Sequence, residues 1–301
     1  MNEQKTIRFV DDGVSVEVSM DEAGAGPPML LLPALSSIST RSEMAQLAQI
    51  LSQDFHVHTV DWPGFGTETR PRADWSPDIL SAFLAEIMDE VRPQAVVAAG
   101  HAASYAVYHL ARHKQILQGL VLVAPTWRGP LPTMMGGQRS WFRRIRGAID
   151  SRATGPLLYA LNVSKPVVKK MAREHVYSDP DWLSDERLRS KMAVTSGKGA
   201  RHASVRFVTG ALDRFTDRAA FLNNARHVPC PILVTYGMET PRKSRAEMDA
   251  LADLPNVRLE RFDLGKLAIH EEFPEDIARI IRDFLTRASD SGPSETGSYE
   301  G

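Results

Sequence analysis

Two histidines and a carboxylate stand where they could exchange protons with a bound molecule. His101 lies in the pentapeptide Gly-His-Ala-Ala-Ser of residues 100–104, between an apolar run and a helical pattern. Glu239 follows another apolar run, and His270 precedes the last helical pattern of the chain. Imidazole and carboxyl groups are common general acids and bases. The sequence therefore offers His101, Glu239 and His270 as candidates for proton-transfer chemistry.

Metal and cofactor chemistry has little support in the sequence. His56 and His58 alternate on one predicted strand, but no Cys or carboxylate is spaced along the chain to complete a metal site with them. The chain has no G-x-G-x-x-G after its first strand, no P-loop and no H-E-x-x-H. We therefore expect no cofactor and no metal.

The elements that must position these residues form an alternating pattern. Apolar runs of strand length lie at 29–35, 56–61, 95–99, 119–124, 232–236 and 257–262, and helical patterns lie at 41–53, 76–91, 102–117, 244–254 and 274–288. Residues 6–10 and 14–20 resemble an antiparallel hairpin at the sheet edge. Strands that alternate with helices indicate right-handed crossovers, so we expect an α/β fold with a mainly parallel central sheet flanked by helices.

Composition excludes several classes of protein. Of 301 residues, 43% are apolar, and 36 Lys and Arg nearly balance 37 Asp and Glu, which argues against a nucleic-acid binder or a disordered chain. The single cysteine, Cys230, excludes a disulfide framework within the chain. The N-terminus has no apolar run of signal-peptide length, and no apolar stretch is long enough to span a bilayer. These features predict a cytoplasmic protein.

The pattern of strands stops between residues 128 and 206. This inserted segment holds helical pieces and carries 16 Lys and Arg against 6 Asp and Glu, a net charge of about +10. It divides the core into residues 1–127 and 207–288, and a Ser- and Gly-rich tail, 289–301, is expected to be disordered. Its charge fits either a solvated surface or contact with an anionic membrane surface or an acidic protein partner. The clearest basic cluster, interleaved with Trp141, Phe142 and Ile145, is Arg139, Arg143, Arg144 and Arg146.

Ordered pieces of residues 6–288 make the chain similar to the α/β-hydrolase superfamily. Residues 30–35 resemble the first parallel strand and oxyanion loop of the superfamily, and residues 61–66 resemble its D-x-P-G-x-G turn, which leads to Arg70. Residues 98–104 resemble its strand-to-helix elbow. Residues 236–237 and 271–277 resemble its last two site loops. The resemblance implies an α/β-hydrolase fold, with residues after Pro125 opening an inserted helical cap over the site.

The same resemblance implies that the catalytic triad is degenerate. Aligned with G-x-S-x-G, the elbow puts Ala102 at the nucleophile position. Thr240 stands at the usual Asp position and Leu267 at the usual His position. Loss of triad members removes several orders of magnitude in rate, so ordinary Ser-His-Asp hydrolysis is not expected. The remaining candidates for catalysis are His101, Ser104, Glu239 and His270, although Ser104 also fits a purely packing position.

The oxyanion hole of the superfamily consists of backbone amides, which survive side-chain substitution. The resemblance assigns it to the N–H groups of Leu35 and Ala103, beside Ala102. Trp127 is expected to add an apolar lining to the same ligand site.

Two functions of different class follow. The first is a pseudoenzyme that binds a small apolar ligand with a carbonyl or carboxylate, or a protein partner, under its cap. The alternative is an enzyme. It is either lyase-like, with His101, Glu239 and His270 as acid/base groups, or an esterase in which Ser104, Ser36 or Ser37 acts as the nucleophile from a displaced position. The ligand and the oligomeric state are not encoded in any motif of the chain.

Overall fold

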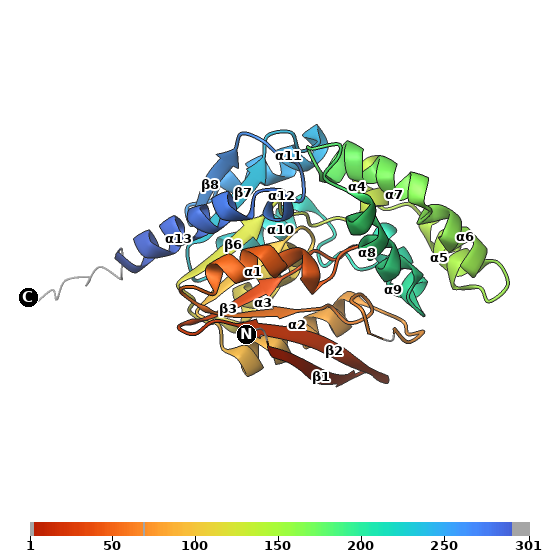
Figure 1. Cartoon of the computed structure of the whole chain (residues 1–301), viewed down its shortest axis with the longest axis horizontal. Coiled ribbons are helices and arrows are strands. Elements are labelled where there is room, and N and C mark those ends of the chain that lie inside the picture. Colours follow the sequence, from red (N-terminus) through yellow and green to blue (C-terminus); the bar gives the residue numbers. More distant parts are fainter. Residues whose placement is uncertain (1–2, 69, 291–301) are drawn as a thin grey trace, which may run out of the picture.

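A computed structural model describes residues 3–68 and 70–290 and shows a single central sheet (Figure 1). The strand order is β1-β2-β4-β3-β5-β6-β7-β8. The strands are β1 (Glu3–Asp11), β2 (Val14–Ala23), β3 (Pro28–Leu32), β4 (His56–Val60), β5 (Ala95–Ala99), β6 (Gly119–Val123), β7 (Ile232–Gly237) and β8 (Val257–Phe262). The β1–β2 and β2–β4 pairs are antiparallel, and the other pairs are parallel. The predicted mainly parallel sheet and edge hairpin are confirmed.

Helices cover both faces of this sheet. The α-helices are α1 (Ala45–Leu51), α2 (Pro77–Val91), α3 (Ala102–His113), α4 (Pro130–Met135), α5 (Phe142–Asp150), α6 (Gly155–Asn162), α7 (Lys165–Met171), α8 (Asp185–Ser196), α9 (Ala200–Val208), α10 (Arg218–Arg226), α11 (Arg242–Asp249), α12 (Ile269–Glu272) and α13 (Pro274–Asp290). Short turns of helix are η1 (Arg41–Met44), η2 (Ala172–Val176) and η3 (Ala250–Asp253). One core layer packs α1 and α13 on the sheet, and the other packs α2, α3 and α10. The predicted α/β architecture is therefore present.

Local signals set several element ends. Ser76 caps α2, because its hydroxyl accepts the Ile79 N–H and Pro77 occupies the first turn. Helix α3 ends at His113, earlier than predicted, since Lys114 adopts a left-handed conformation. Strand β3 ends at Leu32, so the following three residues form a loop instead of extending the strand.

The D-x-P-G-x-G turn after β4 depends on glycine. Gly64 and Gly66 both have positive φ, at 82° and 64°, where a side chain would be strained. A Cβ on Gly64 would lie 2.9 Å from the Cβ of Ala203 in α9. Asp61 is held by Arg41, whose backbone N–H and guanidinium each donate to the carboxylate at 2.6 Å. The turn is thus a rigid surface against which α9 of the inserted segment packs.

The inserted segment forms helices α4–α9, and no strand occurs among its residues 128–206. Figure 1 shows these helices, in green, extending beyond one end of the sheet. Helix α9 continues to Val208, two residues past the boundary that the sequence predicted. Helix α13 likewise runs to Asp290, and residues 291–301 of the predicted disordered tail lie outside the described residues. Within residues 3–68 and 70–290, no helix is both long and apolar enough to cross a bilayer.

Candidate functional site

The turn between β5 and α3 is the geometric centre of the candidate site. Gly100 has φ +51°, and its N–H donates to the Val123 carbonyl at 2.9 Å. His101 already has helical angles, and Ala102 is the first residue of α3. The sequence placed the strained turn at Ala102, and this register is wrong by two residues. A positive φ costs glycine no steric energy, so the turn falls at Gly100.

The new register buries the residues that were expected to face a ligand. Ala102 and Ala103 are fully buried, and the Ala103 N–H donates to the Gly100 carbonyl at 3.3 Å. Ala103 is therefore not a free oxyanion donor, which corrects the prediction. Ser104 is also fully buried, and its hydroxyl donates to the His101 carbonyl at 2.8 Å. This contact fits the packing role of Ser104 and not a displaced nucleophile. Gly100 itself is half-buried and reaches solvent.

Two backbone amides beside the turn remain available. Among the residues that the structure describes, neither the Leu35 N–H nor the His101 N–H has an acceptor. Leu35 follows Ala34, and a Cβ built on Gly100 would lie 3.0 Å from the Ala34 Cβ. The loop after β3 and the turn after β5 are therefore in contact. The His101 N–H lies at the start of α3, where a free amide favours a carbonyl or carboxylate oxygen, and the Leu35 N–H lies in the adjoining loop, so these two are the candidate oxyanion donors.

His101 lies behind the turn and is almost completely buried. Its Nε2 lies 3.2 Å from the Leu212 carbonyl oxygen and 3.6 Å from the nearer carboxylate oxygen of Asp213. Burial lowers the pKa of His101 to about 4 and raises the pKa of Asp213 to about 7. The imidazole is therefore neutral at pH 7, and its Nε2–H donates to the Leu212 carbonyl. His101 therefore has a structural role and is not an exposed base.

Thr240 and Leu267, which the sequence assigned to the two other triad positions, have no carboxyl or imidazole group. Thr240 is buried, and its hydroxyl has no hydrogen-bond partner among the described residues. Glu239 is exposed and makes no ion pair or side-chain hydrogen bond in the described part of the chain. Leu267 is half-buried and packs against the apolar core. The structure does not bring Glu239 to either His101 or His270.

Trp127 is almost completely buried among packing contacts. Its ring stacks at 6.3 Å, centroid to centroid, on Phe221, and the Arg128 guanidinium lies over it. The indole N–H donates to the Glu247 carboxylate at 3.1 Å. Trp127 therefore packs against α10 and α11, and its role as an apolar lining of a ligand site stays a prediction.

His270 belongs to a buried group of charges at the seam between the core and the inserted segment. This seam cluster consists of Glu43, Tyr177, Lys191, His270 and Glu271. The Nε2 atom of His270 lies 3.5 Å from a Glu43 carboxylate oxygen. Lys191, from α8, binds Glu271 at 2.9 Å, and the Tyr177 hydroxyl donates to the same carboxylate at 2.8 Å. The seam cluster thus connects α12 of the core to α8 and η2.

The seam cluster also touches the loop beside Gly100. The Ala34 N–H donates to the Glu43 carboxylate at 2.6 Å. Burial alone would raise the pKa of Glu43, but His270 and Lys191 outweigh it and lower that pKa. Burial likewise opposes the charge on Lys191, yet Glu271 and Glu43 raise the pKa of its ammonium. Both groups are therefore charged at neutral pH, and the cluster is a buried ion network.

A cavity of about 430 Å³ lies within the inserted segment, a volume typical of small-molecule sites. Its walls come from α6, α8, α9 and the loop before α9, with Tyr159, Ala160, Val163, Met192, Thr195 and Ala200 among the lining residues. The Tyr159 hydroxyl lies beside Ser204, whose own hydroxyl is paired with that of Ser37. Ser37 belongs to the loop that follows β3. The Tyr159 hydroxyl has no hydrogen-bond partner among the described residues, so the hydrogen bond here is the Ser204–Ser37 pair, which joins α9 to the loop that carries Leu35.

Comparison with known proteins assigns the family. The model of the alpha/beta hydrolase family matches residues 29–280, most of the chain. The chain belongs to the alpha/beta hydrolase family. No curated protein matches it by sequence.

Solved structures share the fold at low identity. An esterase from Thermogutta terrifontis is 18% identical, with a TM-score of 0.68 over 95% of this chain and 99% of that chain. A haloalkane dehalogenase from Agrobacterium tumefaciens C58 is 16% identical, with a TM-score of 0.68 over 95% and 97%. A probable hydrolytic enzyme from Pseudomonas aeruginosa PAO1 is 15% identical, with a TM-score of 0.70 over 94% of each chain. The likeness establishes the α/β-hydrolase fold that the sequence predicted.

In alpha/beta hydrolases the nucleophile stands on the strained turn between strand and helix. The residue with that geometry here is Gly100, which has no side chain. Sequence reasoning missed Gly100, although a glycine before a helix start is a signal for positive φ. It also missed Glu43 and Lys191, which join His270 only through tertiary packing.

Proposed function

We propose that this alpha/beta hydrolase family protein is non-hydrolytic and binds a small, largely apolar ligand with a carbonyl or carboxylate group. The observation that carries this proposal is the glycine at the turn where the family places its nucleophile. Without an attacking oxygen or sulfur at Gly100, no covalent acyl-enzyme forms there.

The surroundings of Gly100 support binding in place of catalysis. The free amides of Leu35 and His101 suit a ligand oxygen, and the cavity walled by Tyr159 and Ala160 suits an apolar body. The Ser204–Ser37 hydrogen bond joins α9, which also lines the cavity, to the loop that carries Leu35.

A fluorophosphonate probe and a ligand titration test the proposal together. The purified protein should not be labelled and should not hydrolyse p-nitrophenyl esters above background. Gly100→Ser should remain inactive, because Thr240 and Leu267 supply no acid and no base to the new hydroxyl. Labelling of the wild-type chain at any serine would contradict the proposal.

Medium-chain carboxylates such as decanoate are the first ligands to test by calorimetry. Ala160→Trp should fill the cavity and weaken binding at least tenfold, because Ala160 is both exposed and part of the wall. The neighbouring exposed Leu161→Trp, outside the wall, is the matched control. Equal binding by both variants would place the ligand elsewhere.

An anionic membrane surface is the partner that the inserted segment favours. Its helices expose large apolar side chains near basic ones: Met134, Met135, Trp141, Leu157, Leu158, Leu161, Val167 and Met171 are exposed, and so are Arg139, Arg143, Arg144, Lys165, Lys169 and Lys170. Such a mixture is typical of proteins that rest on anionic lipid. We expect salt-sensitive binding to phosphatidylserine vesicles.

Charge reversal on two faces tests this partner. Arg143→Glu with Arg144→Glu should abolish vesicle binding, whereas Arg8→Glu with Arg226→Glu, exposed arginines elsewhere, should not. Equal loss in both pairs would indicate a general charge effect and contradict a membrane-facing inserted segment.

A lyase-like enzyme is the second candidate, and the His270–Glu43 contact favours it. Both ring nitrogens of His270 are buried and lack a hydrogen-bond partner in the described part of the chain. A proton-transfer site would need such a base beside the ligand oxygen. Conversion of the bound ligand by the wild-type protein, lost in His270→Gln, would decide for this function.

A further inference from the structure

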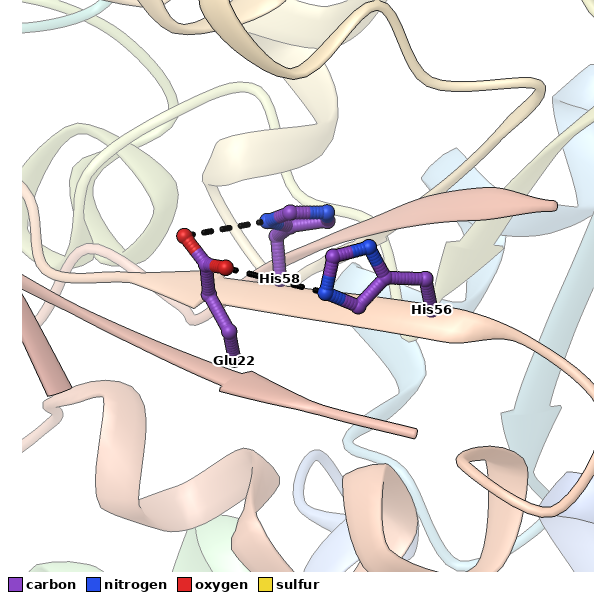
Figure 2. A group of neighbouring side chains, drawn as sticks. All are labelled: Glu22, His56 and His58. Carbon is purple, nitrogen blue, oxygen red and sulfur yellow. Dashed lines mark ion pairs between the residues drawn. The ribbon is translucent and has the colours of Figure 1, made fainter. Parts of the chain in front are cut away.

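Three ligand-type side chains meet at the end of the sheet opposite to Gly100. Figure 2 shows Glu22 of β2 with its carboxylate directed at the imidazoles of His56 and His58 on β4. Glu22 is the direct cross-strand partner of His58 in the antiparallel β2–β4 pair. The sequence showed no carboxylate spaced to join these histidines. Strand pairing supplies one.

The distances are close to those of a metal site. The Nε2 of His56 lies 3.6 Å from one Glu22 oxygen, and the Nδ1 of His58 lies 3.7 Å from the other. Around Zn²⁺, bonds of roughly 2.0–2.2 Å in a tetrahedron separate neighbouring ligand atoms by roughly 3.3–3.5 Å. One donor atom from each of the three residues lies within 4.8 Å of the others. A small inward movement of these side chains would therefore close them on one ion.

Within the described residues, none of the three side chains forms a hydrogen bond or an ion pair outside this group, and Lys5 interacts with Glu22 only through longer-range electrostatics. His58 is buried, and its Nδ1 has no hydrogen-bond partner within the described residues. The Lys5 ammonium pairs with Glu90 of α2. The other cluster with metal-ligand geometry, Glu43, His270 and Glu271, already holds Lys191.

We propose that Glu22, His56 and His58 bind one divalent transition-metal ion, for which Zn²⁺ is the test ion. Two imidazoles and a carboxylate suit this class of ion, and the half-exposed His56 leaves room for a water ligand. His56 begins β4 and Gly100 follows the end of β5, so the site is far from the family's catalytic turn. The ion would fasten the β1–β2 hairpin to the parallel part of the sheet.

The test is a calorimetric titration of the full, tag-free chain with Zn²⁺, combined with thermal unfolding. The wild-type protein should bind one equivalent with micromolar or tighter affinity, and Zn²⁺ should raise its Tm. Glu22→Gln and His56→Gln should each weaken binding at least tenfold and abolish the rise in Tm. Both positions are partly exposed, so these variants are expected to fold.

His113→Gln is the control, because His109 and His113 stack at 4.3 Å on α3 and form the other histidine pair. It should bind Zn²⁺ like the wild-type protein. The proposal is overturned if the wild-type chain takes up no Zn²⁺ at 100 μM. It is equally overturned if Glu22→Gln binds as tightly as the wild type, or if binding disappears only in His113→Gln.

Discussion

The two ends of the central sheet differ in the backbone geometry and the reactive side chains that they carry. The carboxyl end has the backbone of a family active site, with the Gly100 turn and the amides of Leu35 and His101, but no reacting side chain at the turn. The amino end has ordinary strand backbone, yet it gathers Glu22, His56 and His58. A backbone scaffold and the side chains for chemistry are therefore separable features of one sheet. The scaffold depends on the fold, whereas side chains can change one at a time.

The largest effect is expected at the seam cluster, which holds the inserted segment on the carboxyl end. Lys191→Met would leave Glu271 and Glu43 buried without their ammonium partner. Removal of one partner of a buried ion pair costs about 3–5 kcal/mol of unfolding free energy, measured by urea denaturation.

Lys169→Met is the matched control for this variant, since the Lys169–Asp185 ion pair, with 3.6 Å between Nζ and the carboxylate oxygen, is exposed to solvent. Exposed pairs contribute about 0–1 kcal/mol. If Lys191→Met were as stable as Lys169→Met, the seam cluster would not hold the segment, and its charges would be free for a catalytic role.

His101 should give the next largest effect, as a pH dependence of stability. Its folded pKa of about 4 lies below the ordinary value of 6.5, so the unfolded chain binds more protons between these pH values. Its contribution is therefore present above pH 6.5 and is lost as pH falls to 4, by up to about 3 kcal/mol. Asp213 acts in the opposite direction, because its pKa is raised to about 7.

The comparison of His101→Gln with the wild-type chain isolates this term. In denaturant unfolding at several pH values, the unfolding free energy of the variant should rise relative to that of the wild type as pH falls from 6.5 to 4. His227→Gln, at an exposed position, is the control for the substitution itself. Parallel curves for His101→Gln and the wild type would mean that the ring behind the turn is accessible to water and able to act as a base.

The Gly100 turn itself predicts a smaller effect. Gly100→Ala should lose about 1–2 kcal/mol, because φ +51° strains an L-residue and the new Cβ would lie 3.0 Å from that of Ala34. Gly147→Ala, in α5 with open space around it, should instead gain up to about 1 kcal/mol. Thermal unfolding distinguishes the two. If Gly100→Ala left the unfolding free energy unchanged, the strained turn would have to lie at another residue.

Thr240 predicts the smallest change. Its buried hydroxyl has no partner among the described residues and is desolvated without compensation, so the isosteric Thr240→Val should raise the unfolding free energy by up to about 1 kcal/mol. A loss above 2 kcal/mol in thermal unfolding would show that the hydroxyl has a role at the old acid position.

The sequence by itself determined the local elements. Alternation of apolar runs located β5 and β8 to the residue, and the Ser76 cap with Pro77 located the start of α2, because these signals act within one turn of chain. The sequence also predicted a turn without a nucleophilic side chain, which stays a prediction, and the structure places the positive-φ residue of that turn at Gly100 instead of Ala102.

Tertiary structure decided the register of the turn and the partners of the charged groups. The pentapeptide at 100–104 allows a strained turn at Gly100 or at Ala102, and the bond from the Gly100 N–H to Val123 on β6 selects the first. The sheet brings Glu22 to His58, and the inserted segment brings Lys191 to Glu271. Such pairs join residues that are distant in the chain, so burial and strand pairing create them and no local spacing encodes them.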